Sequence, residues 1–137
     1  MDNFLLDTHV WIWMQEADRQ LPSLAIRLLE AAQQERRLFA SAISVLEIAQ
    51  FESKRRVQLT LNIHAWLEQS FADDGIQLLP LTPEIAVAST RLPGSLHRDP
   101  ADRILAATAR IEALTLLTRD VRLLDYGRKG HLRTRRV

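Results

Sequence analysis

The chain has 137 residues, of which 47% are apolar, and a formal net charge of +1, so we expect one packed domain over residues 1–137 and exclude a disordered chain. It contains no cysteine, which excludes a disulfide framework, a thiolate metal site and a cysteine nucleophile. The start carries Asp2 where a signal peptide would be basic, and no apolar run is long enough to span a bilayer. We therefore expect a cytoplasmic protein that does not contact a membrane.

Short apolar runs alternate with helical patterns along the chain. Strands are predicted at residues 4–6, 38–40, 76–81 and 114–118. Helices are predicted at residues 9–14, 22–35, 44–56, 62–71, 83–92, 100–109 and 121–124. Residues 131–137 alternate too weakly to distinguish an edge strand from a mobile end. The alternation predicts an α/β fold with a central, mostly parallel sheet flanked by helices.

Acidic residues follow the predicted strands or begin the predicted helices. Asp7 comes directly after the first strand, and Asp120 follows the fourth. Glu47 lies in the first turn of the helix after the second strand, and Asp99 and Asp102 lie at the start of a later helix. In a parallel sheet the strands end at one edge, where ligands bind. We therefore expect these acids to converge there.

Each acid also has a structural explanation. Ser44 precedes Glu47 by three residues, which is the pattern of a capping box. Asp99 precedes Pro100 and is a natural helix cap. Together, however, four converging acidic segments repel one another unless a cation lies among them. Carboxylates without cysteine or a histidine pair favour Mg²⁺ or Mn²⁺ over Zn²⁺, and such ions support phosphoryl displacement.

The C-terminal end is basic, and the first helix is rich in tryptophan. Residues 119–137 hold seven Arg or Lys against two acids, so this end either binds an anionic ligand beside the acidic pocket or is an ordinary solvated end. Trp11 and Trp13 are interpreted as core or interface residues instead of base-stacking platforms. His9 is interpreted as a structural group, although it lies close enough to Asp7 in sequence to touch a substrate.

Four segments carry a resemblance to a known family. They are Leu5–His9, Ser41–Ile48, His97–Ala109 and Leu117–Asp120. In order and spacing they resemble the motifs of PIN-domain ribonucleases, in particular the VapC-type toxins of bacterial toxin–antitoxin pairs. The resemblance implies a PIN-like fold whose acidic pocket holds one or two Mg²⁺ or Mn²⁺ ions. It also implies a metal-dependent endoribonuclease that cleaves single-stranded regions of RNA, with metal-activated water attacking the phosphodiester.

The resemblance assigns roles to individual residues. The catalytic acids and metal ligands would be Asp7, Glu47, Asp102 and Asp120, with Asp99 as a further metal ligand and Thr8 and Thr118 as auxiliary residues. Arg98, Arg103 and Arg119 lie beside these acids in sequence and are candidates for RNA phosphate contacts, the alternative being ion pairs with the acids. The family also implies a homodimer and a small VapB-like antitoxin protein that blocks the pocket.

Two other functions remain open. A metal-dependent phosphomonoesterase would use a similar acidic cluster, although the chain has no nucleophilic Asp-x-Asp motif. A non-catalytic binding module would use the acidic pocket to hold a basic partner peptide. The sequence does not distinguish transfer, ribosomal and messenger RNA as substrates, nor one metal ion from two.

Overall fold

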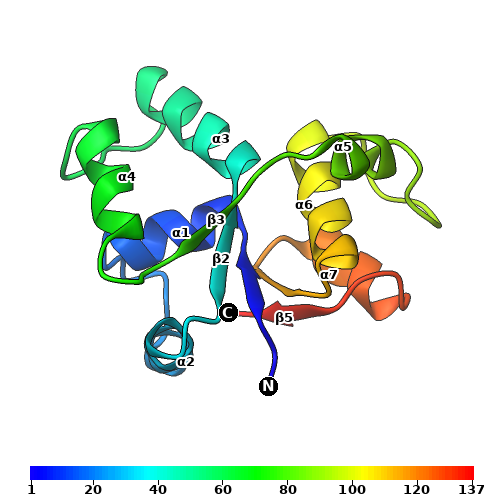
Figure 1. Ribbon diagram of the computed structural model, residues 1–137, viewed down its shortest axis with the longest axis horizontal. Helices are drawn as coiled ribbons and strands as arrows, with labels where there is room; N and C mark the ends of the chain where they lie inside the picture. Colours follow the sequence, from blue (N-terminus) through cyan, green and yellow to red (C-terminus); the bar gives the residue numbers. More distant parts are fainter.

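A computed structural model describes residues 1–137 and shows one sheet of five strands with seven helices around it (Figure 1). The strands are β1 (Phe4–Leu6), β2 (Leu38–Ser41), β3 (Gln77–Leu79), β4 (Thr115–Thr118) and β5 (Thr134–Arg136). The helices are α1 (Thr8–Gln15), α2 (Ser23–Gln34), α3 (Ala42–Ser53), α4 (Ile63–Phe71), α5 (Pro83–Ser89), α6 (Pro100–Ile111) and α7 (Val121–Arg128). The predicted α/β fold with a parallel sheet is confirmed. No helix combines the length and the apolar character that crossing a membrane requires.

The strand order is β3-β2-β1-β4-β5, and every neighbouring pair is parallel. β1 is therefore the central strand, with Leu6 paired to Leu117 of β4. The pairing continues one residue further, because the Asp7 amide donates to the Leu117 carbonyl at 3.0 Å. The residues that follow β1 and β4 thus meet at the same edge of the sheet. The C-terminal segment, which the sequence left undecided, supplies β5 as the edge strand beside β4.

The central strand alternates its side chains between two hydrophobic clusters. Phe4 and Leu6 pack into one cluster with residues of α1, α2 and α4, whereas Leu5 packs into the other with residues of α6 and α7. Figure 1 shows these two groups of helices on opposite sides of β1. Trp11 is fully buried with its ring 5.3 Å from that of Trp66, so the prediction that Trp11 belongs to the core is confirmed.

Several predicted boundaries need correction. Helix α3 begins at Ala42 because Ser41 caps it, its hydroxyl accepting from the Ile43 amide at 3.1 Å. The interpretation of Ser44 as the cap of this helix is therefore wrong. Strand β3 is shorter than predicted, since Pro80 has no amide to continue the ladder. Helix α5 ends earlier, at residue 89, and α7 runs on to residue 128, burying its apolar face in the second cluster.

Candidate active site

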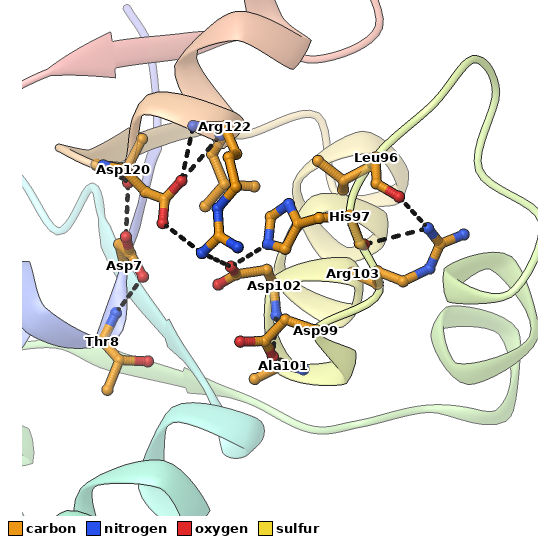
Figure 2. A network of polar contacts seen from close by, with 12 residues as sticks. Asp7, Thr8, Leu96, His97, Asp99, Ala101, Asp102, Arg103, Asp120 and Arg122 are labelled. Atoms are coloured by element: carbon orange, nitrogen blue, oxygen red, sulfur yellow. Dashed lines mark hydrogen bonds and ion pairs between the residues drawn. The ribbon is translucent and has the colours of Figure 1, made fainter.

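Asp7 lies where β1 ends and α1 begins. It caps α1, with Oδ1 accepting from the Thr8 amide at 2.8 Å (Figure 2). Its other oxygen, Oδ2, accepts from the hydroxyl of Thr118 at 2.6 Å. The same hydroxyl accepts from the Asp120 amide at 3.0 Å. Thr118, which is fully buried, therefore links the first acid of the chain to the last.

Glu47 projects from α3 toward the start of α1. The Thr8 hydroxyl donates to Glu47 Oε1 at 2.5 Å and lies 2.8 Å from the Ser44 hydroxyl. Because the Thr8 hydroxyl has one proton, which Glu47 receives, Ser44 must donate to Thr8. Ser44 is fully buried, so it orients Thr8, and through it Glu47, instead of capping the helix.

Asp102 lies in the first turn of α6 beside a histidine. His97 Nε2 lies 2.6 Å from Asp102 Oδ2, and Figure 2 shows the imidazole facing this carboxylate. Asp99 caps the helix, accepting from the Ala101 amide at 2.9 Å. His97, Asp99 and Asp102 offer ligand atoms that all lie within 4.8 Å of one another. No other acidic or histidine side chains of the site bring three ligand atoms this close together.

Asp120 caps α7 and is paired with an arginine. It accepts from the amides of Arg122 and Leu123, and Arg122 Nη2 lies 3.2 Å from Asp120 Oδ2. The same nitrogen lies 3.9 Å from Asp102 Oδ2, so Arg122 spans two acids (Figure 2). Burial alone would raise the pKa of the Asp120 carboxyl, but the hydrogen bonds from Arg122 and the main-chain amides outweigh burial and lower that pKa.

All five predicted acids line one cleft of about 480 Å³ at the carboxyl edge of the sheet. The lining residues are Asp7, Thr8, His9, Val10, Trp13, Glu47, Phe51, Asp99, Asp102, Arg119, Asp120 and Arg122. The acids come from four separate chain segments, as the sequence predicted. Thr118 lies behind Asp7 in the protein interior. The roles of these residues in catalysis stay predictions.

Burial and mutual repulsion make the cleft a poor place for several free carboxylates. Burial raises the pKa of Asp7. Burial, together with the charges of neighbouring acids, raises the pKa of Glu47 and of Asp102 to about 6. A cluster of oxygen ligands that resists full ionisation is suited to a hard divalent cation, whose charge would offset the repulsion. The residues present therefore fit a metal centre.

The three arginines predicted to contact RNA lie in different surroundings. Arg103 points away from the acids (Figure 2), and it donates to the carbonyls of Ser89 at 2.8 Å and Leu96 at 2.9 Å. Arg103 thus holds the loop before α6 in place, and its predicted contact with RNA has no support from this position. Arg98 is exposed but does not line the cleft. Arg119 does line it, so of the three it alone keeps a place beside the acids.

Some residues of the site received no role from the sequence. His97 and Arg122 touch predicted metal ligands, and each was close to one in sequence, five residues before Asp102 and two after Asp120. His9 was interpreted as a structural group that could touch a substrate, and Trp13 as a core or interface residue. Both line the cleft, and their spacing of four residues on a helix places them on one face. The shared helix face with His9 could have indicated from the sequence that Trp13 lies at the site, unlike the buried Trp11 and Trp66.

Comparison with known proteins agrees with this geometry. The family model described as the PIN domain matches residues 4–129. Ribonuclease VapC22 of Mycobacterium tuberculosis (strain ATCC 25618 / H37Rv) is 34% identical over 126 residues, which cover 92% of this chain and 93% of the relative.

Solved structures share the fold at lower identity. VapBC2 from Rickettsia felis, bound to a DNA fragment from its promoter, gives a TM-score of 0.70 at 14% identity and covers 97% of both chains. DNA-bound VapBC from Salmonella typhimurium gives 0.70 at 18%, covering 99% of this chain and 98% of the other. FitAcB from Neisseria gonorrhoeae gives 0.65 at 21%, covering 96% and 95%. The family match over most of the chain and the identity to a ribonuclease together show that this protein belongs to the PIN-domain family, among its VapC-type ribonucleases.

Proposed function

We propose that this protein is a metal-dependent endoribonuclease and the toxin of a type II toxin–antitoxin pair, and that it cleaves single-stranded regions of RNA. One observation carries the proposal: carboxylates from four chain segments line a single cleft in a chain that is 34% identical to a ribonuclease. Residues 1–137 would form a single nuclease domain. We place the protein in the cytoplasm because its proposed RNA substrates are found there.

The metal would be Mg²⁺ or Mn²⁺, held by the carboxylates of Asp7, Glu47, Asp102 and Asp120, with Asp99 at the edge of the cluster. Oxygen ligands support this choice, and the imidazole of His97 beside Asp102 is a donor that Mn²⁺ also accepts. When bound, such an ion lowers the pKa of water and offsets negative charge on a phosphate in phosphoryl displacement.

The protein's own residues would set the geometry of this reaction. Thr118 and Thr8 hold Asp7 and Glu47 through hydrogen bonds of 2.6 Å and 2.5 Å, which fixes two ligands without adding charge. Arg122 is a further cation of the cleft, and its side chain is 59% exposed. It can therefore release Asp102 and bind an oxygen of the RNA phosphate instead. The main-chain hydrogen bonds from Arg122 and Leu123 to Asp120 do not depend on the position of the Arg122 side chain.

The partner would be a small VapB-like antitoxin with a basic side chain that enters the acidic cleft. The structures of VapBC complexes that share the fold support this proposal. We also propose that the protein forms a homodimer. Exposed apolar side chains on two helices, Leu46 of α3 at 52% and Val87 of α5 at 51% exposure, offer a surface for a second copy.

The test is cleavage of a pool of structured RNAs with Mg²⁺ or Mn²⁺ and with EDTA. Asp7→Asn and Asp102→Asn proteins run beside the wild type, and asparagine at residue 7 keeps an oxygen that can cap α1. We expect metal-dependent cuts that fall at least about 100-fold in both variants, since each removes a ligand charge.

Other results would contradict the proposal. A folded wild type that binds Mn²⁺ with a defined stoichiometry but cuts no RNA would favour the phosphomonoesterase if small phosphate esters are hydrolysed. A folded wild type that binds no Mn²⁺ would favour the binding module with a basic peptide.

A further inference from the structure

A second cavity lies beside the acidic cleft, between α2 and the end of β5. Its volume is about 580 Å³, and four arginines line it: Arg19, Arg119, Arg135 and Arg136. We refer to this cavity as the basic groove. No Asp or Glu lines it, and none of the four guanidinium groups forms an ion pair with a carboxylate side chain. The positive charges of Arg19, Arg135 and Arg136 are therefore available to an anionic ligand.

The basic groove and the acidic cleft adjoin at Arg119, which lines both. Its Nε and Nη2 atoms donate to the main-chain oxygens of Val137 at 2.9 Å and Gln20 at 2.6 Å, which ties the guanidinium to the rim. The guanidinium carbon lies 4.7 Å from the centre of the Trp13 ring. Arg119 is thus a fixed bridge between the groove and an aromatic residue of the cleft.

Trp13 belongs to a row of rings along one wall of the acidic cleft. The His9 ring lies 6.0 Å from the Trp13 ring and 5.3 Å from the Phe51 ring, and all three residues line the cleft. His9 is exposed, and Trp13 and Phe51 are half-buried. A cleft that held only acids would repel a polyanion. The aromatic wall and the basic groove supply the attraction that the acids lack.

We infer that the strand of RNA adjoining the cut site lies along this wall and enters the basic groove, a reading that rests on the proposed nuclease function. Bases would stack on His9 and Trp13, and phosphates would meet the arginines, which suit phosphate geometry. Only unpaired bases can stack on these rings, so the aromatic wall and the basic groove together select single-stranded RNA over a duplex. The apolar rim of the groove, where Leu24 is 77% exposed, can contact a further base.

The test measures binding without cleavage. The double variant R135Q/R136Q removes two groove charges outside the acidic cleft. Its matched control, R128Q/K129Q, removes the same charge from the exposed end of α7, where both cations pair with Asp125. Each protein is titrated in EDTA against a fluorescent, 2′-O-methylated single strand of about 12 nucleotides, a length within the usual site sizes. Affinity is recorded at several salt concentrations.

We expect R135Q/R136Q to bind more weakly and to lower the slope of log K against log salt by about 1.4, since each phosphate contact to a single strand contributes about 0.7. The control should keep the wild-type slope. Trp13→Leu should also weaken binding, while Trp13→Phe, which keeps a ring, should restore most of it. A hairpin duplex of the same sequence should bind less tightly than the single strand.

The outcomes separate this inference from the proposed function. If R135Q/R136Q keeps the wild-type salt slope while the wild type cleaves RNA, RNA does not bind in the basic groove, and the proposed nuclease function is retained. A lowered slope with a wild type that never cleaves RNA supports the groove and rejects the nuclease. If the wild type binds an oligoglutamate peptide but no RNA, and R135Q/R136Q loses the peptide, the groove belongs to an acidic protein segment and the inference is wrong.

Discussion

The hydroxyl of Thr118 donates to Oδ2 of Asp7 at 2.6 Å, across the seam between β4 and β1. The same oxygen atom of Thr118 accepts from the Asp120 amide. One buried side chain therefore sets the relative position of two candidate metal ligands that are far apart in sequence. The Thr118 hydroxyl therefore positions Asp7 through a hydrogen bond that adds no positive charge.

Replacing Thr118 by valine keeps the shape of the side chain and removes both hydrogen bonds. We expect Mn²⁺ affinity and RNA cleavage to fall about 10- to 100-fold, the usual effect of losing a partner that orients a ligand. Isothermal titration with Mn²⁺ and cleavage assays measure the two quantities. Thr118→Ser, which restores the hydroxyl, should recover both. Full activity in the valine variant would show that Asp7 needs no such support.

The raised pKa values of Glu47 and Asp102, both about 6, predict how pH affects the metal-free protein. These two carboxyl groups bind protons more tightly in the folded state than in the unfolded state, so proton binding stabilises the fold. This contribution to the free energy of unfolding is complete below the ordinary carboxyl pKa of about 4 and is lost as pH rises through about 6. Thermal unfolding in EDTA at about pH 5 and about pH 7.5 measures the change.

Glu47→Gln is the matched variant for that experiment, because it cannot ionise. The loss of stability from the lower to the higher pH should be smaller in Glu47→Gln than in the wild type. Added Mn²⁺ should raise the wild-type melting temperature more at the higher pH, where protons no longer compete for the carboxylates. Equal pH profiles for the two proteins would mean that Glu47 is already ionised in the folded state.

Arg122 and a divalent cation are expected to compete for the same acids. Its Nη2 lies 3.2 Å from Asp120 and 3.9 Å from Asp102, so Arg122→Gln should raise Mn²⁺ affinity several-fold at low salt. The same substitution should weaken RNA binding, because a phosphate contact is lost. Arg91→Gln, at an exposed position with no ion pair, is the control for net charge. A fall in Mn²⁺ affinity would instead make Arg122 a residue that organises the ligands.

Arg103 is expected to affect stability instead of RNA binding. Arg103→Leu leaves the carbonyls of Ser89 and Leu96 without their partner, at a cost of about 1–3 kcal/mol in the free energy of unfolding. Urea unfolding measures this loss. The salt slope for RNA should match that of the wild type, whereas Arg119→Gln should lower it. A lowered slope in Arg103→Leu would return this residue to the RNA-binding surface.

The sheet and its acidic edge could be predicted because their signals are local. A buried apolar run followed by Asp7 describes a strand and a helix cap within a few residues, and Asp120 repeats the pattern. Ser44 shows where this reasoning stops. Its spacing to Glu47 is that of a capping box, and only the contact with Thr8, brought by another segment of the chain, decides its hydrogen bonds.

The two arginines show a different limit. Arg103 and Arg119 are each adjacent to an acid in sequence, yet consecutive residues of a helix do not face the same way, so Arg103 points away from the site of Asp102. Helical periodicity could have indicated this. The basic charge of the C-terminal end could be read from the sequence, but the groove that it forms with α2 could not, because α2 and β5 come together only through the completed sheet.

The order of the acids along the chain has a consequence for synthesis. Asp7 and Glu47 come early, but Asp120 follows β4, whose partner in the sheet is the first strand. The cleft is therefore complete only after nearly the whole chain has left the ribosome. A growing or prematurely terminated chain lacks Asp120, a candidate metal ligand, and the strand that precedes it. If these acids are the catalytic ligands, a ribonuclease built in this order would be inactive toward the ribosomal and messenger RNA that surrounds it during synthesis.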